Sequence, residues 1–197
     1  MIGTVASTST SYISLIIIGI HLSHSDAGIY SSVLTIISIL MFFPKLFTQV
    51  FLPEFSKLFG EGDNKRISQI FNKTNSVMIL LSALICLLVF IFSHNILSIF
   101  GKEFSEGSLI LRILIPSLFI RMISIPFVSF LSGTKYVLYP NIGGIIILII
   151  SSLCWVLLVP DHNLVGIAIG YTAGIVIGIG YQIFMAIMKI KSFNANY

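Results

Sequence analysis

Long apolar stretches constrain this chain more than any other feature. Four of them, residues 74–93, 108–132, 137–159 and 164–188, each hold about 20 or more mostly apolar residues. A helix needs about that length to cross the hydrocarbon core of a bilayer, which is roughly 30 Å thick. Only 9% of the residues are charged, whereas soluble domains carry roughly 25%. The sequence therefore predicts an all-α integral membrane protein.

Two weaker stretches bring the expected number of spans to about six. Residues 3–22 are polar in their first half, and residues 28–52 end before Pro53, where a helix commonly stops. The polar segment 54–73 is predicted to be a cytoplasmic interfacial connector, with a short helix capped by Asp63. We thus predict one transmembrane domain over 1–197, a helix bundle whose spans cover about 3–22, 28–52, 74–93, 108–132, 137–159 and 164–188.

Loop charges are divided unequally between the two sides of this predicted bundle. One side holds most of the loop cations: Lys57, Lys65, Arg66, Lys73, Lys135, Lys189 and Lys191. The other side holds Lys102 together with four acids: Asp26, Glu103, Glu106 and Asp161. Because basic loops stay on the cytoplasmic side, we expect both termini in the cytoplasm and the protein in the cytoplasmic (inner) membrane.

Arg121 is the most informative charge inside a predicted span. It lies about 16 Å from the inner end of span 108–132 at the helical rise of 1.5 Å per residue, so it is near the midplane. Ser117, Arg121 and Ser124 share one helix face, and Pro116 is expected to bend the helix one turn earlier. An ionisable group at this depth usually faces a cavity or a buried partner. We therefore predict that Arg121, Ser117 and Ser124 bind substrate.

A polar stripe with a second cation runs along span 28–52. Its members recur at steps of three and four residues: Ser31, Thr35, Ser38, Phe42, Lys45 and Gln49. Such a stripe indicates a polar interior rather than lipid. Lys45 and Gln49 are therefore further candidates for substrate binding, although Lys45 could also reach the inner surface by extending its side chain.

Arg112 is the third cation within a span. It lies on the opposite face of its helix from Arg121 and near the outer surface. We expect it to have a structural role, paired with one of the outer acids Asp26, Glu103 or Glu106.

Glycines recur at every fourth position of the last span: Gly166, Gly170, Gly174 and Gly178. Small residues at this spacing form a groove that lets another helix approach closely. These glycines are therefore predicted to be a helix-packing surface, and a smooth face of this kind could also slide or bend in a conformational cycle.

Signals for catalysis, metal binding and nucleic-acid binding are missing from the sequence. The four histidines fall near the predicted outer surface, without the His and Glu spacing of a metal site. The two cysteines lie within different apolar stretches and define no disulfide framework. We therefore expect no enzymatic activity, no catalytic residues, no metal and no cofactor.

Ordered short motifs resemble those of polysaccharide flippases of the O-antigen type. They occur in sequence at Gly28–Tyr30, Leu52–Pro53, Glu54–Lys57, Gly62–Asp63, Ile99–Phe104, Leu131–Lys135 and Leu164–Ala168. The resemblance covers about residues 10 to 190, and the wider superfamily also contains lipid II flippases and multidrug and toxin extruders. It implies that lipid-linked oligosaccharide is moved to the outer leaflet by alternating access. It also implies that this chain is the second six-helix lobe and needs a first lobe or a second copy.

Two other functions remain open from the sequence. A multidrug or toxin extruder lobe would be expected to carry an acidic residue inside its cavity, and no Asp or Glu lies within a predicted span. A non-transporting membrane scaffold of a glycan-assembly complex would predict that Arg121→Ala leaves glycan export intact.

Overall fold

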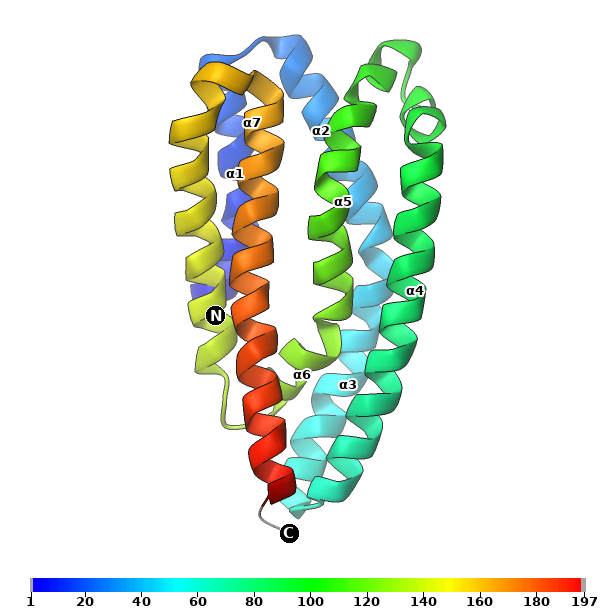
Figure 1. The fold of residues 1–197 in the computed structure, drawn as a ribbon, viewed down its shortest axis with the longest axis vertical. Coiled ribbons are helices and arrows are strands. Elements are labelled where there is room, and N and C mark those ends of the chain that lie inside the picture. Colours follow the sequence, from blue (N-terminus) through cyan, green and yellow to red (C-terminus); the bar gives the residue numbers. More distant parts are fainter. Residues whose placement is uncertain (1, 196–197) are drawn as a thin grey trace.

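The computed structural model describes the backbone of residues 2–195 and the side chains of 9–42, 44–63 and 65–191. It is an all-α bundle (Figure 1). Its elements are α1 (Ile2–His21), α2 (His24–Leu40), α3 (Phe42–Glu61), α4 (Asn64–Ser98), η1 (Lys102–Gly107), α5 (Ser108–Ile123), α6 (Ile125–Gly133) and α7 (Leu138–Ala195).

Over residues 2–195 these helices form a membrane bundle. The α4 segment Lys65–Ser98 and the α7 segment Leu138–Lys191 are each long and apolar enough to cross a membrane, and α1 contains a shorter apolar segment, Ser9–His21. Two further pairs of helices are long and apolar enough to cross a membrane only if each pair is taken as one bent span. The pair α2/α3 bends by 44°, and the pair formed by η1–α5 and α6 bends by 43°.

Helix α7 is a hairpin of two arms that lie side by side (Figure 1). Asn163 interrupts it with φ 48° and ψ −128°, values that lie outside the helical region. Trp155 in the first arm donates its Nε1–H to the carbonyl of Ile167 in the second, at 3.0 Å. The two arms correspond to the predicted spans 137–159 and 164–188.

The four regularly spaced glycines of the second arm lie against the first arm. A Cβ on Gly166 would lie 2.5 Å from the carbonyl oxygen of Leu158, and one on Gly178 would lie 2.7 Å from that of Gly143. A Cβ on Gly170 would contact Trp155 at 2.6 Å. The backbones therefore approach too closely for larger side chains, which is the geometry that small residues at this spacing permit.

The segment 54–73, predicted to be an interfacial connector with a short helix capped by Asp63, consists of the ends of two long helices. Its location at the membrane surface stays a prediction. Helix α3 continues through Pro53 to Glu61, and α4 begins at Asn64. Phe55 is fully buried and meets Phe130 of α6 edge to face, with ring centroids 6.0 Å apart. Packing against α6 therefore holds the helix together beyond the proline, which by itself would remove one helical hydrogen bond.

Gly62 joins α3 to α4 in a left-handed conformation, with φ 72°, and Asp63 then caps α4 by accepting a hydrogen bond from the Arg66 N–H at 3.0 Å. We expect Gly62→Ala to destabilise the fold by about 1 kcal/mol, because a Cβ is strained at positive φ. Gly60→Ala is the matched control: a Cβ on either glycine would have no atom within 4 Å, but Gly60 is helical. Thermal unfolding in detergent should lower Tm for Gly62→Ala only, and equal shifts in both variants would contradict the expectation.

The predicted span 108–132 breaks at Ser124 and not at Pro116. Helix α5 continues through Pro116. One turn earlier, the Thr172 hydroxyl of α7 donates a hydrogen bond to the Ile113 carbonyl at 3.0 Å. The break lies where Pro126 enters the first turn of α6. A proline lacks an N–H and clashes with the carbonyl four residues earlier, which explains why α5 ends here.

Candidate functional site: a cationic cavity between α1, α2, α3, α5, α6 and α7

Arg121 lies half-buried near the C-terminal end of α5, just before the break at Ser124. Its guanidinium carbon is 5.7 Å from the ring centroid of Tyr171 in the second arm of α7. The hydroxyl oxygen of Tyr171 in turn lies 3.1 Å from Ser11 Oγ of α1. A cation over an aromatic face is attracted by the ring, so α1 and α7 together hold the arginine in place.

Lys45 lies in the first turn of α3, just after the bend between α2 and α3. Its side chain is exposed, and its backbone N–H donates to the Met41 carbonyl at 3.1 Å. Among the described side chains, none forms a hydrogen bond or an ion pair with its ammonium group. The lysine is therefore available to a ligand.

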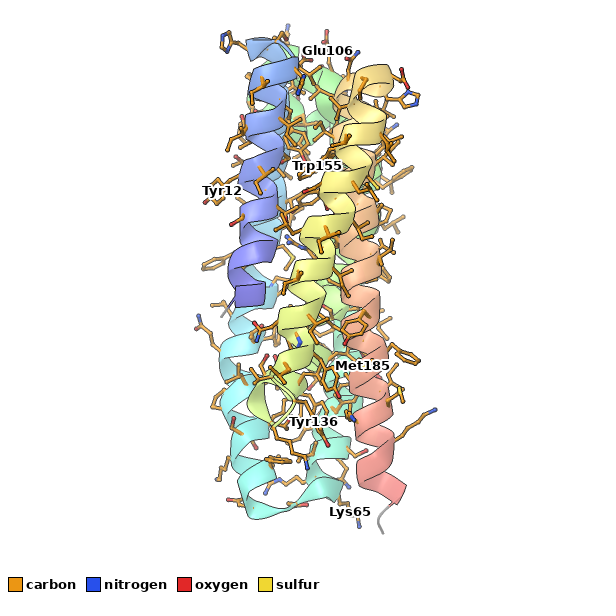
Figure 2. All side chains as sticks on the ribbon, turned by 90° about the vertical axis from the view of Figure 1, so that its left-hand side faces the viewer. Tyr12, Lys65, Glu106, Tyr136, Trp155 and Met185 are labelled. Atoms are coloured by element: carbon orange, nitrogen blue, oxygen red, sulfur yellow. The ribbon has the colours of Figure 1, made fainter. Side chains whose placement is uncertain are left out.

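Both cations line the same space. It consists of two adjoining cavities. The upper cavity, of about 640 Å³, is lined mainly by α1 and α2, and the lower cavity, of about 540 Å³, is also lined by α6 and both arms of α7. The two share Lys45, Arg121 and the α1 residues Ser11 and Tyr12. Tyr12 projects from α1 with 65% of its surface exposed (Figure 2). The upper cavity also takes in the polar face of α2, whose members Ser31, Thr35 and Ser38 were predicted from their spacing.

The cavity is positive because no acid balances its two bases. None of the described residues that line either space is Asp or Glu. No described side chain forms an ion pair with Arg121. Two cations without a counter-charge favour a ligand that carries negative charge. The effect is larger at the half-buried Arg121 than at the exposed Lys45, because burying a charge without a partner is costly.

The predicted site residues separate into two groups. Arg121, Lys45 and Ser124 line the cavities, and Ser124 donates its hydroxyl proton to the Arg121 carbonyl at 2.8 Å. Gln49 and Ser117 do not line them. Gln49 is exposed elsewhere on α3, and Ser117 is fully buried, with its hydroxyl donating to the Leu114 carbonyl at 2.6 Å.

The α2/α3 bend explains why Gln49 is displaced from the predicted stripe. The stripe assumed one continuous helix through residues 28–52, but the bend at Met41 reorients every later residue. Thr48, three residues after Lys45, therefore lines the lower cavity in place of Gln49.

Gln182 is a cavity residue that the sequence reasoning missed. It lies on the second arm of α7, is 6% exposed, and donates its Nε2–H to the Pro140 carbonyl of the first arm at 3.1 Å. Both residues line the lower cavity. An amide in an otherwise apolar span is itself a signal of an inward-facing position, and it could have identified this residue.

Arg112 does not pair with an outer acid, as we had expected. Its Nε donates to Ser93 Oγ of α4 at 2.9 Å, and its guanidinium carbon is 5.3 Å from the Phe90 ring centroid. The face of α5 that carries Arg112 packs on α4, so the nearest partners come from that helix and not from the loops. Arg112 and Arg121 thus occupy different environments on one helix.

The fold and the cavity define a class of protein: an all-α membrane bundle in which a polar site lies among apolar helices. Among the described residues, no group of His, Cys, Asp and Glu could hold a metal ion.

Comparison with known proteins agrees with this class. The MatE family matches residues 1–160, so the chain belongs to the MatE family, whose members are membrane transporters and not enzymes. The chain is also similar to the crystal structure of MATE in the bent conformation, with a TM-score of 0.90 and 11% sequence identity. That likeness covers 99% of this chain and 44% of the other, so the chain has the fold of about half of a MATE protein. No curated protein matches the sequence.

Proposed function

We propose that this chain is the second lobe of a two-lobe flippase that moves lipid-linked oligosaccharide across the cytoplasmic membrane by alternating access. The observation that carries the proposal is the unpaired cation pair, Lys45 and Arg121, in a cavity whose described lining contains no acid. A lipid-linked sugar diphosphate has an anionic head that cannot enter hydrocarbon unaided. An arginine fork held against Tyr171 suits two phosphate oxygens, and Lys45 adds a mobile point charge.

The other half of the cavity wall would come from a first six-helix lobe or from a second copy of this chain. The chain has the fold of only about half of a MATE protein. Rocking of two lobes around a central site is a common transporter design. The bends at Met41 and Ser124 lie beside the two cations, so a change in either bend would move them.

The orientation that we propose follows from the charges at the two ends of the bundle. Lys65 and Glu106 lie at opposite ends (Figure 2). The end with Lys65 also carries Arg66 and Lys57, and by the positive-inside rule it faces the cytoplasm. This orientation would place the C-terminal end of α7 on the cytoplasmic side, whereas α1 begins about midway along the bundle and runs to the opposite end (Figure 1). The cytoplasmic location of both termini stays a prediction, and residues 1 and 196–197 lie outside the described part of the chain.

The test is transport by the full-length protein in proteoliposomes. We expect it to move a fluorescent polyprenyl-diphosphate oligosaccharide between leaflets and to leave an organic cation behind, because the cavity offers no carboxylate to bind the cation. Export of the cation without movement of the diphosphate would overturn the proposal in favour of an extruder. Movement of neither would favour a scaffold.

A further inference from the structure

A second hollow, separate from the cationic cavity, lies between α3 and α4 near the turn that joins them. Its volume is about 410 Å³. It shares no lining residue with the two spaces around Arg121. Figure 1 shows that the α3/α4 hairpin forms one corner of the bundle, and the groove lies along it.

The part of this groove far from the turn is apolar. Phe47 and Phe51 stack along α3, with ring centroids 6.0 Å apart and planes 9° from parallel. Val50 is 64% exposed and Val77 of α4 is 50% exposed, while Met78 forms the buried floor. The groove is thus a slot with apolar walls that runs parallel to the helices, as an extended acyl chain does in a bilayer.

The part nearer the turn carries one acid and one base. Glu54 follows the apolar wall of α3 by one helical turn, and Lys73 precedes that of α4 by about one turn. Among the described side chains, neither group forms an ion pair or a hydrogen bond. Lys73 also lies where the polar start of α4 meets its apolar stretch, which begins at Val77. We therefore expect both charges to lie at the level where lipid headgroups meet the hydrocarbon.

We propose that this groove binds a zwitterionic phospholipid of the bilayer whose headgroup carries a primary ammonium, as in phosphatidylethanolamine. Its phosphate contacts Lys73, its ammonium donates hydrogen bonds to Glu54, and one acyl chain lies along Phe47, Phe51 and Val77. The unpaired acid and base match the two charges of this headgroup. A purely anionic headgroup would leave Glu54 facing negative charge, and a quaternary ammonium has no N–H to donate.

Native mass spectrometry of the delipidated full-length protein tests the selectivity directly. Phosphatidylethanolamine, phosphatidylcholine and phosphatidylglycerol with identical acyl chains would be titrated separately. We expect phosphatidylethanolamine to bind about tenfold more tightly than phosphatidylcholine, because a hydrogen bond to a charged group contributes about that factor. Equal binding of the three lipids, or a preference for phosphatidylglycerol, would overturn the proposal whatever the variants do.

Variants then locate the site. Glu54→Gln should abolish the preference for phosphatidylethanolamine over phosphatidylcholine, and Lys73→Gln should weaken both lipids. Glu61→Gln and Lys57→Gln are matched controls, since these residues lie at the same end but outside the groove. Val77→Trp should fill the slot and reduce binding of all three lipids, whereas Leu80→Trp, at a position 74% exposed, should not. A preference that persists in Glu54→Gln and Val77→Trp would place the lipid elsewhere and overturn the proposal.

Discussion

Arg121→Ala is expected to slow movement of a diphosphate-linked oligosaccharide by about 10- to 100-fold. A hydrogen bond to a charged group contributes about 1.5–3 kcal/mol, and each 1.4 kcal/mol or so is a factor of ten in rate. Arg121→Lys should restore only part of this loss, because a lysine keeps the charge but not the planar fork that engages two oxygens at once. Lys45→Ala should have a smaller effect, since Lys45 is exposed and its charge is better screened.

The measurement is the initial rate of flipping, normalised to the amount of folded protein. Arg112→Ala is the matched control, because it removes an arginine from the same helix but outside the cavity, where it contacts Ser93 and Phe90. Normal rates in Arg121→Ala and Lys45→Ala at normal protein level would remove the role of the cavity charges. Normal glycan export with poor recovery of associated proteins would instead support the scaffold function.

Gly178→Leu is expected to destabilise the α7 hairpin strongly. A Cβ at this position would lie 2.7 Å from the Gly143 carbonyl oxygen and would also meet Ile147. The backbone of the first arm cannot move aside as a flexible side chain could. We therefore expect a loss of about 3 kcal/mol, the upper end of what overpacking of a well-packed core costs. Separation of the arms would also break the Gln182–Pro140 hydrogen bond in the lower cavity wall.

Gly180→Leu provides the control for this substitution. Gly180 lies about half a turn further along the same arm, and a Cβ there would have no atom within 4 Å. Leucine also favours the helix over glycine by up to about 1 kcal/mol, so this variant should be at least as stable as the wild type. Both would be compared by Tm in detergent and by yield of monodisperse protein. Equal Tm values would show that the two arms do not need the close approach at Gly178.

Features that depend on local sequence were predictable. Apolar length and scarce charge predict an all-α membrane bundle, because hydrocarbon leaves a backbone few other ways to satisfy its polar groups. The midspan position of Arg121 likewise predicts a cavity or a buried partner. Arg121 lines a cavity whose lining also includes Lys45, and its role in substrate binding stays a prediction. Glycine spacing indicated the close contact within α7, although the partner could not be read from the spacing alone.

Features that depend on packing between distant residues were not predictable. Pro53 signals a helix end, yet contact of Phe55 with Phe130 continues α3 beyond it. Pro116 and Pro126 carry the same local signal, but the helix breaks only beside Pro126. We expected Arg112 to pair with an acid at a similar depth in the membrane. Because α5 packs on α4, Arg112 instead donates a hydrogen bond to Ser93.

The long apolar spans by themselves determined that this chain is a bundle of membrane helices. Length and apolar composition decide whether a stretch enters the bilayer, and there a helix pairs all of its own backbone groups. Which polar side chains share a cavity was decided only by the tertiary structure. After the bend at Met41, Thr48 lines the lower cavity and Gln49 does not. The α7 hairpin places Gln182 in the lining of the same cavity. A rotation of one helix after a bend is set by contacts with its neighbours, and those contacts join residues that no local pattern connects.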